Sequence, residues 1–354
     1  MTVRKNMKSI SLSRITMTAS LFLFVVPLIV FAAGPVVTNV KSKQVPGTHK
    51  VEILYDLSAD SPSTVAVHVS DDGGSSYDVD VPPVALSGDI GANIAAGTRK
   101  IEMDADASDR LAHIFSKHIR IKVVASIDHA AGLVAYYPFD GNANDASGNN
   151  LHLASDGVTA TADRFGRSDS AYHFDGFDDW LHVDNIPEPS DNAFSWALWF
   201  KPDAIPTGAD GGDWIFNRNN VNSFDFMVSP HLILRPDGTI TFSSYDGRLD
   251  GNQNWMNVLK SKTIFIVDQW YHIVCTSGLD NTRRIYVDGV LDSSLVSSGY
   301  GQTGLGTINI GADRNPLYHG AGSPGWFQGI IDDVRIYGRE LSAAEVTSLY
   351  GTHQ

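Results

Sequence analysis

Short runs in which apolar residues stand at every second position recur along this chain of 354 residues. The first clear run is Val51–Leu57, and Val65, Val67 and Val69 repeat the pattern directly before a turn signal at Asp71–Gly74. A period of two residues is that of a β-strand with one buried face, and runs of this length bounded by glycine and aspartate are typical of antiparallel sheets. The pattern therefore predicts an all-β protein.

Composition agrees with this prediction and excludes several kinds of partner. The chain has 32 glycines, and its many turn-forming residues favour short strands over helices. The 40 acidic residues outnumber the 26 basic ones, giving a formal net charge of −14, which opposes binding to nucleic-acid phosphates and anionic lipids. The single cysteine, Cys275, forms neither an intramolecular disulfide nor a thiolate zinc site, and its apolar strand predicts a buried side chain.

The N-terminus has the pattern of a secretory signal peptide. Four basic residues precede an apolar stretch from Ala19 to Phe31, and Val30 and Ala32 stand at the spacing that signal peptidase accepts. The stretch is shorter than the ~20 residues needed to span a bilayer. We expect residues 1–32 to be removed, leaving 22 basic (26 minus 4) against 40 acidic residues in a secreted, periplasmic or cell-surface protein with no membrane anchor.

Two β-domains of different size are expected after the signal segment. Strand-like runs over residues 35–127 recur at the spacing of a small sandwich, and about ninety residues in this arrangement are typical of immunoglobulin-like or fibronectin type III-like domains. Residues 128–131 are small and polar and are predicted to form a linker. A different pattern begins at Gly132 and continues to residue 354.

The larger domain carries seven motifs. They are Gly132–Asn149, Ala171–Leu181, Phe194–Lys201, Gln269–Ile273, Ile285–Val290, Ile308–Gly311 and Gly329–Tyr337. In this order they resemble the laminin-G-like, concanavalin A-like jelly-roll family. The resemblance implies two curved antiparallel sheets stacked face to face, and a carbohydrate-binding or adhesive module of a secreted protein.

Local patterns within this domain support the same fold. Phe194–Lys201 has aromatic residues on both strand faces, which predicts a middle strand covered on both sides. The aromatic residues assigned to the core are Trp196, Trp199, Phe200 and Trp270. Ser342 and Glu345 form a capping-box pattern, which predicts a short helix over residues 343–350.

Catalytic patterns are missing from the sequence. Glycosidases on this sandwich need two facing carboxylates, with a glutamate acid/base and a nucleophile. The five glutamates, Glu52, Glu102, Glu188, Glu340 and Glu345, provide no pair at alternate strand positions. Asp332 and Asp333 are adjacent, so the pleat is expected to send them to opposite faces. We therefore predict a protein that is not an enzyme, with a glycoside hydrolase as the least favoured alternative.

A calcium ion is the predicted cofactor. Asp332 shares its predicted strand face with apolar residues, and such a carboxylate must be paired, hydrogen-bonded or metal-bound. The family resemblance implies a calcium ion between an acid of this strand and oxygens near the first strand, which corresponds to Asp332 and Asp140. The oxygen-rich segment that follows Asp140 either contributes ligands or forms an Asx-rich turn. The resemblance also implies a calcium position after the Ile-Gly motif, at Asp313 and Asn315.

Ligand-binding residues are expected in loops, because sugar sites combine aromatic faces with amides and carboxylates that core residues cannot offer. The candidates are Trp214, Asn217, Arg218, Tyr245, Trp255 and Tyr318. Trp255 is the first choice because its sequence neighbours are polar. The prediction is a jelly roll that recognises a carbohydrate or another cell-surface ligand, and the alternative is an adhesive or scaffolding protein that binds a protein partner.

Overall fold

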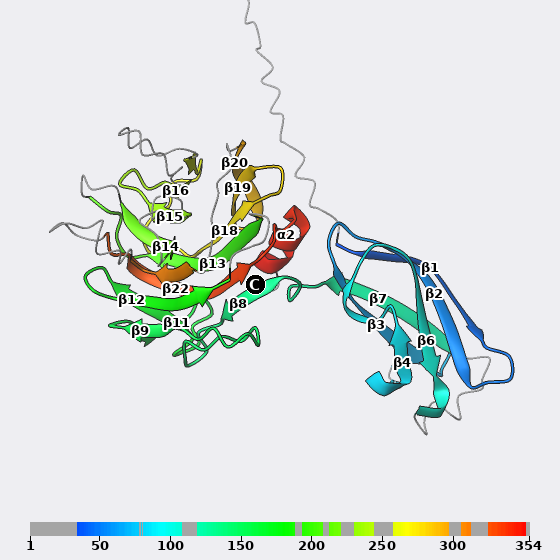
Figure 1. Ribbon diagram of the computed structural model, residues 1–354. Coiled ribbons are helices and arrows are strands. Elements are labelled where there is room, and N and C mark those ends of the chain that lie inside the picture. Colours follow the sequence, from blue (N-terminus) through cyan, green and yellow to red (C-terminus); the bar gives the residue numbers. More distant parts are fainter. Residues whose placement is uncertain are drawn as a thin grey trace, which may run out of the picture. The chain divides into compact units, whose positions relative to one another are not determined.

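The computed structural model is almost entirely composed of β-strands (Figure 1). The residues that it describes are 34–77, 79, 81–107, 119–187, 193–207, 212–220, 230–243, 258–296, 306–312 and 325–351. None of the described helices has the length and hydropathy needed to cross a lipid bilayer.

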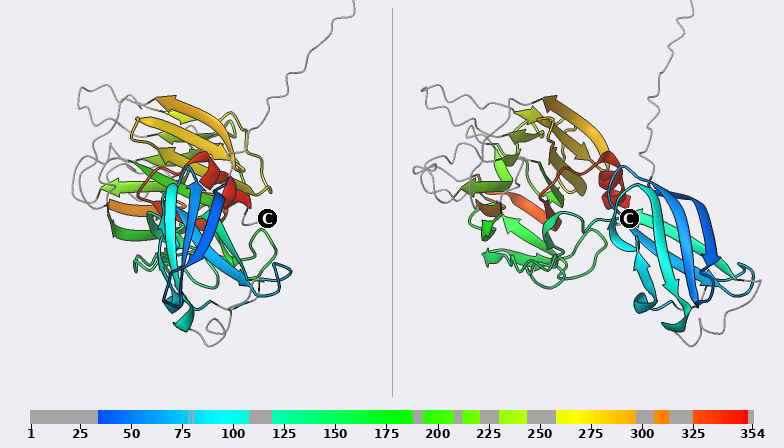
Figure 2. Two further views of the ribbon diagram at one scale, coloured as in Figure 1. Left: turned by 90° about the vertical axis from the view of Figure 1, so that its right-hand side faces the viewer. Right: turned by 45° about the vertical axis from the view of Figure 1, so that its right-hand side comes forward.

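Residues 36–127 form a small sandwich of two sheets (Figure 2). One sheet has the order β1 (Val36–Gln44), β2 (Lys50–Ser58), β6 (Gly97–Asp104) and β4 (Leu86–Gly88), and the other has β5 (Gly91–Ile94), β3 (Ser63–Ser70) and β7 (Arg120–Ile127). The 3₁₀ turns η1 (Pro83–Ala85) and η2 (Ala105–Ala107) complete it. Ile53, Tyr55 and Leu57 are buried in its core, as the period-two pattern predicts.

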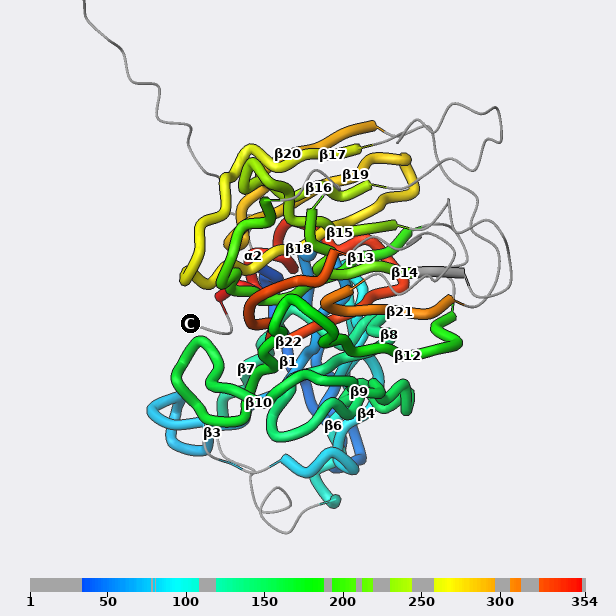
Figure 3. Tube along the Cα trace, turned by 90° about the vertical axis from the view of Figure 1, so that its left-hand side faces the viewer, coloured from blue at the N-terminus to red at the C-terminus, as the bar shows by residue number. Residues whose placement is uncertain are grey.

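The larger sandwich begins at β8 (Leu133–Tyr137) and also has two sheets. The eight-stranded sheet has the order β10 (Thr159–Thr161), β11 (Ala171–Asp175), β22 (Gln328–Tyr337), β13 (Phe194–Pro202), β18 (Tyr271–Ser277), β19 (Thr282–Val287) and β20 (Val290–Val296), with β8 also paired to β22. The seven-stranded sheet has the order β17 (Leu259–Lys260), β16 (Ile240–Ser243), β15 (His231–Leu234), β14 (Asp213–Asn220), β21 (Gly306–Ile310), β12 (Trp180–Ile186) and β9 (Ala154–Asp156). Figure 3 shows these seven strands one beside the next.

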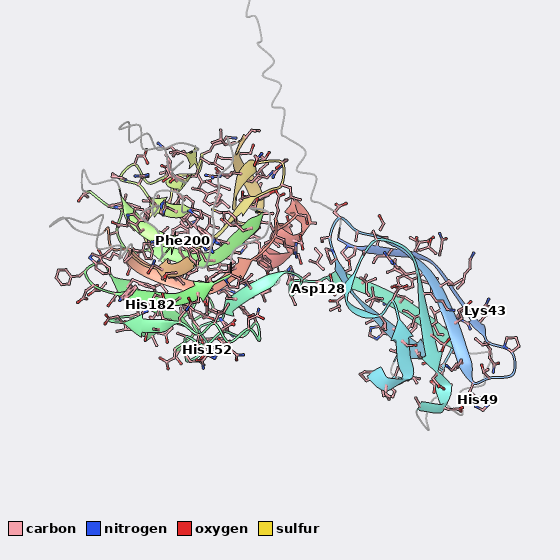
Figure 4. The ribbon with its side chains drawn as sticks, in the orientation of Figure 1. Lys43, His49, Asp128, His152, His182 and Phe200 are labelled. Atoms are coloured by element: carbon pink, nitrogen blue, oxygen red, sulfur yellow. The ribbon has the colours of Figure 1, made fainter. Side chains whose placement is uncertain are left out.

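Strand β13 carries buried side chains on both of its faces, as predicted. Trp196 and Phe200 lie in the core between the two sheets, and Figure 4 labels Phe200 there. On the other face, Ala197 belongs to a second apolar cluster with Val346 and Leu349 of helix α2 (Ala343–Gly351). The helix therefore covers part of the outer face of the eight-stranded sheet.

The capping box of α2 is confirmed. The backbone N–H of Ser342 donates to Glu345 Oε2 at 2.8 Å, and the N–H of Glu345 donates to Ser342 Oγ at 3.3 Å. Cys275 is buried in the core, also as predicted, and burial raises the pKa of its thiol.

A β-bulge in β22 overturns one expectation. The pairing of β22 with β13 shifts register between Ala197 and Trp199, and Asp333 has a φ of 53°. This left-handed conformation breaks the alternation of the pleat. Consequently Asp332 and Asp333 do not point to opposite faces, because both carboxylates contact the guanidinium of Arg164. The rule that adjacent strand residues point to opposite faces fails here because it assumes a regular extended backbone.

Candidate functional site

The outward face of the seven-stranded sheet is polar. In β12, Leu181 and Val183 enter the core, whereas Trp180 and His182 occupy the alternate positions, which face outward. Figure 4 labels His182 on this strand. In the neighbouring strands most apolar residues also fill the core, although Trp214 and Ile233 lie with the polar residues on the outward face. We call this surface the polar face.

One continuous row of polar side chains crosses the polar face. The strand registers place Ser243 opposite His231, His231 opposite Asn217, Asn217 opposite Asn309, and Asn309 opposite His182. We call these five residues the polar row. With strands ~4.8 Å apart, the row extends over roughly 19 Å. Its members come from five different strands, so only the fold brings them together.

The middle of the polar row is fixed by buried amide hydrogen bonds. Asn309 Nδ2 donates to Asn217 Oδ1 at 2.9 Å, and Asn217 Nδ2 donates to the backbone oxygen of Ala312 at 2.8 Å. Asn217 is 0% exposed and Asn309 is 3% exposed. Two hydrogen bonds therefore hold both amides in one orientation.

Both ends of the row have unused hydrogen-bonding capacity. Ser243 Oγ and His182 Nδ1 are buried and have no hydrogen-bond partner among the residues that the structure describes. Most buried polar side-chain atoms in proteins have a partner, and an exception requires an explanation such as a bound group or water. Each end of the row therefore keeps one buried polar atom whose hydrogen-bonding capacity no described residue uses.

Aromatic rings accompany the polar row. The ring of Trp180 stacks on that of His182 with centroids 4.1 Å apart and an interplanar angle of 7°. Trp180 Nε1 donates to Asp156 Oδ2 at 3.2 Å. Farther along the sheet, Trp214 meets His231 edge to face at 4.5 Å. Both Trp180 and His182 are only partly buried, so they offer an accessible aromatic surface next to the row.

A carboxylate also lies at the Trp180 side of the polar face. Asp184 continues the outward alternation of β12, and its Oδ1 accepts a hydrogen bond from Thr307 Oγ1 at 2.7 Å. Asp184 is exposed. Together with Asp156, it makes this side of the face acidic.

The predicted ligand residues on β14 lie in a strand and not in a loop, so that expectation was wrong. Trp214 and Asn217 both belong to the polar face, although each is at most 8% exposed. Arg218 points away from this face, because its Nη2 donates to the backbone oxygen of Ile186 and it lines a small pocket with Trp196.

Three predicted ligand residues and two predicted calcium residues lie outside the described residues: Tyr245, Trp255 and Tyr318, and Asp313 and Asn315. Sequence reasoning did not select Trp180, His182 and Asn309 as contacts. The signal that reveals the first two is the alternation of Trp180 and His182 with Leu181 and Val183, which places them together on the face opposite the core.

Comparison with protein families identifies this domain. Residues 174–347, from β11 to α2, match the model described as the Concanavalin A-like lectin/glucanases superfamily. The C-terminal domain has the concanavalin A-like jelly-roll fold. The match does not extend to residues 35–127, whose fibronectin type III-like nature stays a prediction. A search of curated proteins found no match.

Solved structures similar to this chain include a toxin binding domain and one domain of an extracellular enzyme. One is the botulinum neurotoxin serotype D binding domain, at 19% identity and a TM-score of 0.48, with 63% of this chain and 51% of that chain covered. Another is domain 4 of AbnA, a GH43 extracellular arabinanase from Geobacillus stearothermophilus, in complex with arabinotriose, at 19% identity and a TM-score of 0.46, with 62% and 98% covered. The chain thus spans about half the length of the neurotoxin chains that it matches.

The two acids first predicted to share a calcium ion have different partners in this concanavalin A-like domain. Asp332 Oδ2 lies 2.5 Å from Arg164 Nη1, and the Asp332 side chain is 1% exposed. The Asp140 side chain is 56% exposed, and its Oδ1 lies 3.7 Å from Arg167 Nη2. Burial and the neighbouring Asp333 carboxylate raise the pKa of Asp332, and the guanidinium of Arg164 opposes this effect.

The segment after Asp140 forms turns closed by its own side chains. Asp145 accepts hydrogen bonds from the backbone N–H groups of Tyr136, Ser147 and Leu151. Burial works against ionisation of Asp145, but these hydrogen bonds lower its pKa overall. The Asx-rich turn, one of the two alternatives considered for this segment, accounts for these contacts.

Another acidic group lies in the loop before Trp180. Carboxylate oxygens of Asp175, Asp178 and Asp179 lie within 4.8 Å of one another. Asp179 is buried and accepts a hydrogen bond from the backbone N–H of Asp175 at 2.8 Å, while burial raises its pKa. The spacing allows one cation to reach all three, but no second feature of the described residues points to an ion there.

Proposed function

We propose that the polar face is a carbohydrate-binding surface and that the protein is a secreted binding protein. The observation that carries this proposal is the in-register polar row, whose amides are buried and whose ends, Ser243 and His182, each hold a polar atom with no described partner. Sugar hydroxyls both donate and accept hydrogen bonds, so they match a row of amide, hydroxyl and imidazole groups. Secretion rests on the signal-peptide pattern of the sequence.

The partly buried stack of Trp180 and His182 supplies the apolar component of this proposed site. Sugar rings have one face of C–H groups that packs on aromatic rings, and tryptophan is the largest such ring with a polar edge. Because Trp180 borders the polar row, a sugar seated on the stack places its hydroxyls toward His182 and Asn309. The proposed glycan therefore runs across β12 and β21, from the ring stack toward the amide of Asn309.

Charge narrows the class of glycan. Two acids accompany the stack on this side of the polar face: Asp156, which accepts from Trp180, and Asp184, which accepts from Thr307. Carboxylates repel the carboxylates of sialic and uronic acids, and such repulsion is a strong source of specificity. The proposal is therefore a neutral or amino-sugar glycan.

Binding without cleavage is also part of the proposal. Described glutamates are engaged elsewhere: Glu345 caps α2, Glu340 pairs with Arg284, and Glu52 and Glu102 form ion pairs in the N-terminal sandwich. Hydrolysis of glycosides needs a matched acid and base or nucleophile across the bond. The glutamates of the described residues offer no such pair on the polar face.

A glycan array probed with the mature chain tests the proposal, using two matched histidine variants. His182→Ala removes one end of the polar row, whereas His173→Ala changes a partly buried histidine of β11 on the other sheet, where it contacts Asp203. We expect neutral glycans to bind to the unchanged protein and to His173→Ala, and to be lost from His182→Ala. Binding to no glycan, or equal binding by all three proteins, would contradict the proposal.

A further inference from the structure

We infer that the guanidinium of Arg164 takes the place of the calcium ion that the family resemblance implies at Asp332. The positive charge of this arginine neutralises the two acids of β22. While the guanidinium lies between them, a divalent ion does not fit at that position. The residues that support this inference do not belong to the polar face.

The bulge in β22 brings two carboxylates together around the guanidinium of Arg164. Arg164 Nη1 lies 2.5 Å from Asp332 Oδ2, and Nη2 lies 2.7 Å from Asp333 Oδ2. A single guanidinium thus bridges two carboxylates from consecutive residues, which a regular strand would send to opposite faces. The positive φ of Asp333 makes this two-point contact possible.

Because these side chains are buried, the two carboxylates need an opposite charge close to them. The side chains of Arg164, Asp332 and Asp333 are 5%, 1% and 6% exposed, respectively. Removing charges from water is costly unless the opposite charges lie in good geometry. Arginine remains charged at all physiological pH values and binds carboxylates through a rigid fork, so it provides a permanent counter-charge where calcium would provide an exchangeable one.

The surroundings of Arg164 leave its guanidinium in one position. The guanidinium carbon lies 4.5 Å from the ring centroid of Trp199 and 4.6 Å from that of Phe165. Asp333 Oδ1 accepts a hydrogen bond from Tyr136 at 2.8 Å and lies 3.3 Å from Arg335 Nη2. The acids therefore face two guanidiniums, and this positive charge repels a divalent cation.

This replacement predicts a latent metal site. Substituting Arg164 by alanine removes one positive charge and most of a buried side chain, and leaves the two carboxylates of β22 facing the vacated space. Two carboxylates with additional oxygen ligands are a suitable environment for calcium. Calcium should therefore bind to the Arg164→Ala variant at a place where it does not bind to the unchanged protein.

Melting temperatures measured in chelator and in millimolar calcium test the inference. We expect Arg164→Ala to melt at a lower temperature than the unchanged protein and to recover at least ~4 °C more than that protein does when calcium is added. Adding Asp332→Asn to Arg164→Ala should abolish the extra recovery, whereas adding Asp178→Asn should leave it. If calcium stabilises Arg164→Ala no more than the unchanged protein, the inference is overturned.

A milder variant keeps the test decisive if Arg164→Ala does not fold. Asp332→Asn preserves the shape of the side chain in an otherwise unchanged protein. If calcium binds at Asp332 in the natural protein, this change removes any stabilisation by calcium, and the inference fails. If the calcium response, or its absence, is the same before and after the change, Asp332 does not hold calcium and the inference stands.

Discussion

The side-chain amide of Asn309 donates a hydrogen bond of 2.9 Å to the side-chain oxygen of Asn217, linking β21 to β14 at the centre of the polar row. Asn217 in turn donates to the backbone oxygen of Ala312. Because the Oδ1 of Asn217 accepts and its Nδ2 donates, the orientation of both amides is determined. Under the proposed function, the donors and acceptors of the row are arranged before a glycan binds, which reduces the entropy lost on binding.

Removing either amide of this pair should lower the stability of the domain, and the effects of the two removals should not be additive. We expect Asn217→Ala and Asn309→Ala each to lower the free energy of unfolding by ~1–3 kcal/mol, because each leaves a buried polar group unpaired. Since they share one hydrogen bond, the double variant should lose less than the sum of the two single losses. Urea unfolding of the four proteins measures this coupling, and strictly additive losses would show that the two amides do not depend on each other.

Trp180 should matter for binding more than for stability. We expect Trp180→Ala to reduce retention on a neutral glycan about tenfold, equivalent to ~1.4 kcal/mol, because the stacking surface is lost. Trp180→Phe, which keeps a ring, should retain most of the affinity. Affinity electrophoresis measures retention, and thermal melting provides the control.

The matched control for this experiment is a tryptophan of the core. Trp196 is 2% exposed between the sheets, so Trp196→Ala should destabilise the domain by ~3–5 kcal/mol. If Trp180→Ala destabilises the domain to the same extent, its ring packs as core and the proposed sugar contact is lost.

Removing the acids beside Trp180 should relax selectivity by charge. We expect the double variant Asp156→Asn/Asp184→Asn to bind a sialylated glycan several-fold better than the unchanged protein does, with a smaller change for its desialylated counterpart. The gain should shrink as salt rises, because salt screens exposed charges. Paired measurements with both glycans at two salt concentrations check this, and an equal change for both glycans would contradict the proposed role of charge.

Asp213 should make stability depend on pH between about 4 and 6. Burial raises the pKa of Asp213 to about 6, above the ~3.9 of an unfolded chain. The folded state therefore holds this proton more tightly, and its stabilising contribution is present below pH ~4 and is lost as the pH rises through about 6. We expect Asp213→Asn to gain stability relative to the unchanged protein over this interval.

Melting temperatures at pH 4 and pH 7 measure the effect of Asp213→Asn, with the exposed Asp178→Asn as control. A difference between Asp213→Asn and the unchanged protein that stays constant across this range would show that Asp213 does not titrate there.

The sequence predicts the sandwich core well because burial of apolar residues follows strand periodicity. Trp196 and Phe200 are core residues as their alternation in β13 indicates, and the Ser342–Glu345 cap follows from local hydrogen-bonding chemistry alone. Both features depend on residues close together in the chain. The Asx-rich turn after Asp140, one of the two alternatives considered for that segment, also depends on residues close together in the chain.

The features that the sequence did not reveal depend on irregular backbone or on distant pairing. A bulge between Trp214 and Phe216 places Ile215 and Phe216 both in the core, so the period of two that would have identified β14 as a strand is interrupted. The bulge at Asp333 likewise has no signature in an alternating pattern. The polar row is a matter of register between five strands, which no single segment encodes.

Strand β22 has a consequence for how the protein is made. It pairs with β8, β11 and β13, so residues 328–337 supply the strand on which the first strands of the jelly roll, beginning at residue 133, must assemble. During synthesis these early strands therefore emerge from the ribosome long before their partner exists and present unpaired edges that holdase chaperones recognise. The strands of the N-terminal sandwich, by contrast, are all present once residue 127 has emerged. A nascent chain stalled before residue 328 should thus carry one folded domain followed by an aggregation-prone one.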